Sequence, residues 1–195
     1  TKKSPQILTG ILARWETYLL DEGNPLYLRA YAWLKLVAFW TVLRGEDTTW
    51  ITPSSMSWKS TSGLKASLSQ TKTTGSSKKV RSGEIHIAAK AFLVDESWLK
   101  VGWDLWKNAD DRRQNFIVLP TDDMEDFTNL SAIPAGRAAL TRQILALGGL
   151  QGEDTKTDTK IIDASSRYWT EHFSRAALVS MARAINVPKS IKDRM

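Results

Sequence analysis

The chain has 195 residues, enough for one large domain or two small ones, and a formal net charge of +6 at pH 7. It contains no cysteine, which excludes disulfide frameworks, zinc fingers, iron–sulfur clusters and thiol nucleophiles, and only two histidines, which argues against a histidine-rich metal site. The longest apolar stretch, residues 30–43, is interrupted by Lys35 and is too short to span a bilayer. Nine tryptophans predict a packed aromatic interior in a basic, soluble, intracellular-type domain.

Two helices are predicted in the first quarter of the chain. Ser4 and Pro5 have the residue types of a helix cap and a first helical position, and an amphipathic pattern continues to about Leu20. Asn24 and Pro25 repeat the same signal. The apolar residues that follow recur every three or four positions, which predicts a longer helix over about 25–43.

The pattern then changes to the two-residue period of β-strands. Residues 64–68 alternate between apolar and polar side chains, as do residues from Val80 to Ile87, and a turn-rich segment at 73–77 separates them. We therefore expect a small antiparallel sheet. His86 follows this alternation between two isoleucines, so we interpret it as a residue on one face of the sheet.

The second half of the chain is predicted to be mainly helical. Residues 108–129 are acidic and read as connecting structure, and 151–160 as a polar loop. Helices are predicted over 98–106 after Ser97, over 136–147 before Gly148–Gly149, from Asp163 or Ser165 to about Asn186, and again from Pro188. No repeat or linker divides the sequence, so the predicted fold class is α+β in one domain over 1–195, mostly helical with a small antiparallel sheet or hairpin.

Positive charge is concentrated around the predicted sheet. Between residues 56 and 90 there are seven basic side chains and one acidic side chain, while the rest of the chain is neutral overall. A basic strip on a neutral body is typical of proteins that bind a polyanion. The alternative is a lysine-rich hairpin whose charge only keeps the protein soluble.

A second group of side chains has the chemistry to handle a phosphate. Arginine forms paired hydrogen bonds to phosphate oxygens, lysine supplies a point charge and a proton, and histidine moves protons near neutral pH. His172 and Arg175 lie three residues apart on one predicted helix and therefore share a face. The other candidates are Arg44 at the end of the second predicted helix, Asp47 beyond it, and Lys72 at the tip of the basic hairpin.

Each candidate also has an ordinary interpretation. Arg44 would complement the helix dipole as a C-terminal charge, and a lone lysine such as Lys72 is more often solvated than functional. A histidine in an arginine-containing protein often has an arginine neighbour. The functional interpretation therefore depends on the combination.

The order and spacing of these residues resemble the catalytic core of the tyrosine recombinases, the phage-integrase family. Asp47 follows Arg44 by three residues, Lys72 lies on a hairpin 28 residues after the arginine, and His172-Phe173-Ser174-Arg175 falls on a later helix. The surrounding sequence is similar to Crypton-type recombinases of dinoflagellate genomes. The segments that carry this likeness are Arg29-Ala30-Tyr31-Ala32-Trp33-Leu34-Lys35-Leu36-Val37, Arg44-Gly45-Glu46-Asp47-Thr48, Thr71-Lys72-Thr73 and Tyr168-Trp169-Thr170-Glu171-His172.

The resemblance implies a site-specific DNA recombinase or integrase that needs no metal or nucleotide cofactor. Arg44 and Arg175 would clamp the scissile phosphate, Lys72 would protonate the departing 5′ oxygen, and His172 would assist proton transfer. Asp47 would orient the first arginine or the histidine. The implied partner is double-stranded DNA, bound by basic residues of the hairpin region, and the full-length protein would form a homo-oligomeric, tetrameric synapse in the nucleus. The DNA-binding candidates are Lys65, Lys78, Lys79 and Arg81.

The chain departs from the family pattern in its last part. The family's nucleophilic tyrosine follows the His-x-x-Arg motif by about thirty residues, but the sequence ends 20 residues after Arg175. We expect a fragment that ends before the nucleophile, lacks the amino-terminal core-binding domain and does not cleave DNA alone. The alternative is a recombinase-derived domain that binds DNA without cutting it. The tyrosines present are Tyr18, Tyr27, Tyr31 and Tyr168.

Overall fold

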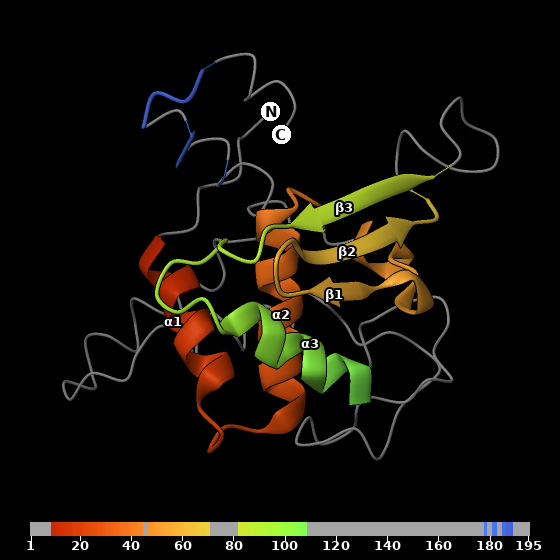
Figure 1. The fold of residues 1–195 in the computed structure, drawn as a ribbon. Coiled ribbons are helices and arrows are strands. Elements are labelled where there is room, and N and C mark those ends of the chain that lie inside the picture. Colours follow the sequence, from red (N-terminus) through yellow and green to blue (C-terminus); the bar gives the residue numbers. More distant parts are fainter. Residues whose placement is uncertain are drawn as a thin grey trace, which may run out of the picture.

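Three α-helices and a three-stranded antiparallel sheet make up the part of the chain that the computed structural model describes, namely residues 9–44, 47–70, 82–108, 178, 181–182 and 185–188 (Figure 1). The α+β prediction is confirmed. In chain order the elements are α1 (Thr9–Leu20), α2 (Leu26–Trp40), the 3₁₀ helices η1 (Asp47–Trp50) and η2 (Pro53–Ser55), β1 (Ser57–Lys59), β2 (Gly63–Leu68), β3 (Gly83–Ile87) and α3 (Trp98–Asn108).

The sheet has the order β1-β2-β3, with both pairs antiparallel. Leu64 lies between Trp58 and Ile87, and these side chains belong to the inner face with the other apolar residues of the strands. The sequence predicted β2 and β3 but missed β1, because three residues are too few to establish an alternation. Ser82 lies outside β3, so the strand begins later than the alternation from Val80 predicted.

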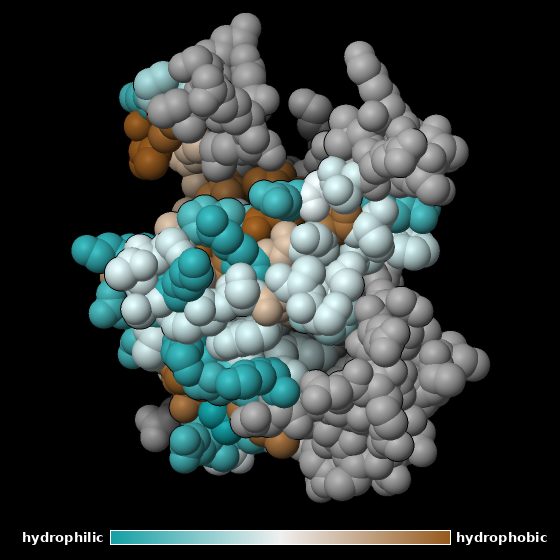
Figure 2. Space-filling model, turned by 45° about the vertical axis from the view of Figure 1, so that its right-hand side comes forward, coloured by the Kyte–Doolittle hydropathy of each residue, from teal (hydrophilic) through white to brown (hydrophobic). Residues whose placement is uncertain are grey.

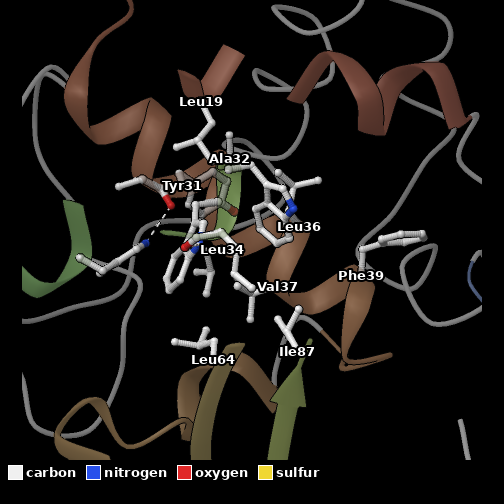
Figure 3. Packing of buried hydrophobic residues seen from close by; sticks show 14 of the residues in the cluster. Leu19, Tyr31, Ala32, Leu34, Leu36, Val37, Phe39, Leu64 and Ile87 are labelled. Carbon is white, nitrogen blue, oxygen red and sulfur yellow. Dashed lines mark hydrogen bonds between the residues drawn. The ribbon is translucent and has the colours of Figure 1, made fainter. Parts of the chain in front are cut away.

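Helix α2 confirms the predicted long helix and forms the centre of the core. All thirteen residues from Tyr27 to Phe39 are buried. Helices α1 and α3 both contact α2, and Figure 3 shows Leu64 and Ile87 of the sheet pointing toward Val37 of α2. A helix that is apolar around its whole circumference is stable only when it is covered on all sides.

Two basic residues of α2 are accommodated inside this core. The Nε–H of Arg29 donates a hydrogen bond to the carbonyl oxygen of Leu19, at 2.8 Å, which ties α2 to the end of α1. The ammonium group of Lys35 lies 5.1 Å from the centre of the Tyr31 ring, within the range of a cation–π interaction.

Tryptophan side chains connect α3 to its neighbours. The indole N–H of Trp33 donates to Leu99 of α3 at 3.2 Å, and that of Trp106 donates to Ala30 of α2 at 2.9 Å. Gly102 allows the close approach, because a Cβ atom there would lie only 1.9 Å from the ring of Trp33. The predicted start of α3 at Trp98 is confirmed.

A buried carboxylate holds the connection between β3 and α3. Glu16 of α1 is fully buried, and its two oxygens accept hydrogen bonds from the backbone N–H groups of Leu93, Val94 and Asp95 at 2.8–3.3 Å. Desolvation raises the pKa of Glu16, although the backbone hydrogen bonds oppose this shift. One side chain thus satisfies three successive amides of a segment that is nearly eighty residues away in sequence.

Helix ends differ from the predictions in detail. Pro25 occupies the N-cap position of α2, while the side chain of Asn24 donates to the carbonyl oxygen of Tyr18 instead of capping α2. The last residue described as helical is Ala182; Asn186, where the sequence placed the end of the last long helix, lies in a turn, and its φ of 56° allows Val187 N–H to bond to Ala182. The residues before Thr9, the predictions over 108–129, 136–147 and 151–160, the start of the last long helix and the helix after Pro188 lie outside the described residues.

Candidate nucleic-acid interface

The segment that carries Arg44 begins with an unusual helix end. Helix α2 stops at Trp40, and hydrogen bonds from Val42 to Phe39 and from Leu43 to Ala38 form a Schellman motif. Val42 has a φ of 57°, a left-handed conformation that is strongly disfavoured for a β-branched side chain. The prediction that Arg44 ends the helix is therefore wrong: Arg44 lies four residues beyond it.

Asp47 and Arg44 are linked through the backbone of a tight turn. The Asp47 carboxylate accepts a hydrogen bond from the Arg44 backbone N–H at 3.1 Å, and the Arg44 carbonyl oxygen accepts from Asp47 N–H at 2.9 Å. Asp47 thus fixes the main chain of the arginine. Its proposed action on the guanidinium group stays a prediction.

This turn continues directly to the end of β2. Ile51 bridges to Leu68, and the carbonyl oxygen of Trp50 accepts from both the backbone N–H and the hydroxyl of Ser69, at 3.0 and 3.2 Å. Ser69 lies three residues before Lys72 in the sequence. The structure therefore places the Arg44 turn beside the point where the chain leaves β2 toward Lys72.

The remaining predicted site residues are only partly placed. Lys65 is exposed on β2. The predicted site residues outside the described part of the chain are Lys72, Lys78, Lys79, Arg81, His172 and Arg175. Their convergence with Arg44 stays a prediction.

Two residues beside Arg44 were missed by the sequence reasoning. Trp50 is 41% exposed, whereas the neighbouring Ile51 is fully buried, so an anchored backbone presents this indole ring to solvent. Nothing in the sequence distinguishes Trp50 from the tryptophans of the core. Val42 gave no signal either, because glycine or asparagine is the usual mark of a left-handed helix end.

No group of three or more potential metal ligands occurs within the described ranges. Within the same residues, no helix is long and apolar enough to cross a membrane. In Figure 2, where the side that carries the sheet in Figure 1 comes forward, the described surface is mostly teal or pale, with brown atoms in small groups.

Comparison with known proteins identifies the fold. No family model matches the chain, and no curated protein does. Among solved structures the chain is similar to "FLP Recombinase-Holliday Junction Complex I", with a TM-score of 0.51 and 12% sequence identity. The match covers 95% of this chain but 43% of the recombinase, so the chain spans less than half the length of that protein. The fold is that of the tyrosine-recombinase catalytic core, as predicted.

Proposed function

We propose that this chain is the catalytic core of a site-specific DNA recombinase or integrase. The observation that carries the proposal is the position of Arg44, in a fold similar to a recombinase core, beside the end of β2 that leads to Lys72. The order of the remaining motif residues in the sequence supports it. In this proposal residues 1–195 form one catalytic-core domain.

The reaction is a pair of transesterifications. A tyrosine hydroxyl supplied from outside these 195 residues attacks the phosphorus, forming a 3′-phosphotyrosine bond and releasing the 5′ oxygen. His172 assists removal of the proton from the tyrosine hydroxyl, and Lys72 protonates the 5′ oxygen; in the second step a 5′ hydroxyl attacks the phosphotyrosine and the tyrosine hydroxyl is restored. Arg44 and Arg175 stabilise the charge on the non-bridging oxygens, a task worth about 3–4 kcal/mol per donor in other enzymes. Asp47 holds the Arg44 turn in place, and no metal or nucleotide takes part.

The proposal extends to the biological setting. The chain binds double-stranded DNA, with Lys65, Lys78, Lys79 and Arg81 contacting the backbone. The FLP structure contains a Holliday junction, the branched DNA that forms when strands are exchanged between duplexes. We infer that the full-length protein acts as a homo-oligomer, a tetramer on DNA, encoded by a Crypton-type mobile element and active in the nucleus.

Binding to duplex DNA at several salt concentrations tests the proposal. We expect the full chain to bind a fluorescein-labelled 30-base-pair duplex in an anisotropy assay. About six phosphate contacts give a slope of about −5 for the logarithm of the association constant against the logarithm of the salt concentration. Arg44→Gln reduces the magnitude of that slope by about 1, whereas Lys107→Gln on α3 leaves it unchanged. Absence of binding at low salt would contradict the proposal.

The coding sequence downstream of residue 195 separates a recombinase from a domain that only binds DNA. A tryptophan or histidine followed by tyrosine, about thirty residues after Arg175, agrees with the enzyme. A stop codon near Met195 agrees with the binding domain.

A further inference from the structure

The outer face of the sheet carries an unusual row of polar and basic side chains. Ser57, Lys65 and His86 are direct neighbours across the three strands, and all three are exposed. Lys59 lies two residues from Ser57 on β1, on the same face, and is also exposed. We refer to these four residues as the sheet-face row.

The carboxylates of the described residues do not pair with the lysines of the row. Within the part of the chain that the structure describes, no ion pair involves Lys59 or Lys65, whereas Lys100 on α3 pairs with Asp104. One acidic residue, Glu84, lies on β3 of the same face, opposite Ser67 instead of a lysine. The face therefore has a net positive charge that is available to a ligand.

His86 is held in a fixed orientation in this row. Its Nε2 lies 2.5 Å from the carbonyl oxygen of Ser62, in the turn between β1 and β2. Because a carbonyl oxygen only accepts, Nε2 carries the hydrogen of that bond and Nδ1 is left for a second partner. The ring therefore cannot swing away freely from the two lysines.

The size of the row matches a stretch of DNA backbone. Adjacent strands lie about 5 Å apart, so the row from Ser57 to His86 extends about 10 Å. A duplex carries one negative charge for about every 1.7 Å of its axis, so about six phosphate charges lie along that distance. Each cation of the row then has a phosphate within reach, and contacts of this kind position a protein without reading the base sequence.

We propose that the outer face of the sheet is a second DNA contact, in which the sheet-face row holds the phosphate backbone of a duplex beside the Arg44 turn. This inference rests on the proposed function, because it assumes that the ligand is duplex DNA. The link between the two surfaces is β2, which carries Lys65 near one end and bonds to the Arg44 segment at the other. The row supplies sequence-independent affinity, while the Arg44 turn engages the phosphate that reacts.

Two double variants of the full chain test this inference. Lys59→Gln/Lys65→Gln removes two charges from the sheet face, and Lys100→Gln/Lys107→Gln removes two charges from α3. Both are titrated against a labelled 30-base-pair duplex of mixed sequence between 0.1 and about 0.5 M NaCl, a range in which phosphate contacts dominate the salt dependence. Circular dichroism checks that both variants are folded.

For the sheet-face variant, we expect the slope of the logarithm of the association constant against the logarithm of the salt concentration to be about 1.8 smaller in magnitude than for the wild type. If the two lines meet near 1 M salt, binding at 0.1 M salt is about 60-fold weaker. The α3 variant keeps the wild-type slope. Equal slopes for the two double variants would overturn the inference and the backbone contact assigned to Lys65, whereas the recombinase proposal stands as long as the wild-type chain binds the duplex and Arg44→Gln lowers its slope. Failure of the wild-type chain to bind the duplex would overturn both.

Discussion

The Gly102→Ala variant is expected to lose about 2 kcal/mol or more of its free energy of unfolding. The new methyl group would lie 1.9 Å from Cδ1 and 2.2 Å from Cγ of Trp33. That ring is fully buried, donates a hydrogen bond to Leu99 and lies beside the ring of Trp106, so it has little room to move. Alanine gains about 1 kcal/mol in helix propensity, but overpacking at this overlap costs about 3 kcal/mol or more.

Gly10→Ala in α1 is the matched control, because no atom lies within 4 Å of the position of its new Cβ. Urea unfolding followed by circular dichroism measures both variants. Gly10→Ala is expected to unfold at the same or a slightly higher urea concentration than the wild type. A Gly102→Ala protein as stable as the wild type would show that α2 and α3 do not pack as closely as described.

The second large effect is expected at Glu16, where the Glu16→Ala variant loses about 3 kcal/mol of unfolding free energy. Its carboxylate accepts hydrogen bonds from three successive amides, and each buried donor left without a partner costs about 1–3 kcal/mol. Opening of the 93–95 segment to water recovers part of this cost. Faster hydrogen exchange at these amides, with α1 still protected, is the expected signature.

The pH dependence of the same residue has a definite sign. Desolvation, helped by repulsion from Asp95, raises the pKa of Glu16 above its ordinary value. Between the unfolded and the folded pKa, the folded state holds a proton that the unfolded state has lost, so stability from this group declines as the pH rises through the folded pKa. The free energy of unfolding of the wild type, minus that of Glu16→Gln, is therefore expected to fall as the pH rises from acid toward neutral.

Urea titrations at several pH values, with Glu22→Gln at the exposed turn after α1 as the control, measure this difference. The control is expected to follow the wild type across the same range. If the wild type instead gained stability relative to Glu16→Gln toward neutral pH, that result would contradict the desolvation of the Glu16 carboxyl group.

The sequence predicted the elements whose signals are local. The apolar run of α2, the alternation in β2 and β3 and the start of α3 at Trp98 each follow from a few neighbouring residues. Burial of α2 on all sides was not predicted, because it depends on α1, α3 and the sheet together. Glu16 was missed for the same reason, since its partners lie nearly eighty residues away and consist only of backbone groups.

In the candidate site too, local sequence signals identified some residues, while their positions depend on tertiary structure. Arg44, Asp47 and Lys65 were selected from residue type and order, but the Schellman end that places Arg44 outside α2 depends on a strained valine. The pairing of Trp50 with Ser69, which brings this turn to β2, depends on sheet geometry that no spacing reveals. Residue type and order therefore selected these candidates, and the tertiary structure determined where the described ones lie.

Because the chain contains no cysteine, engineered cysteines can test directly whether Arg44 and Arg175 face one phosphate. The pair Arg44→Cys/Arg175→Cys is treated with a short bis-maleimide and compared with Arg44→Cys/Lys107→Cys. Because Trp106 contacts Ala30, about 15 Å of α2 separates Lys107 from the Arg44 end. We expect an intramolecular cross-link between positions 44 and 175 and none between 44 and 107. A chain that remains unlinked between 44 and 175 under the same conditions would contradict a shared phosphate site for the two arginines.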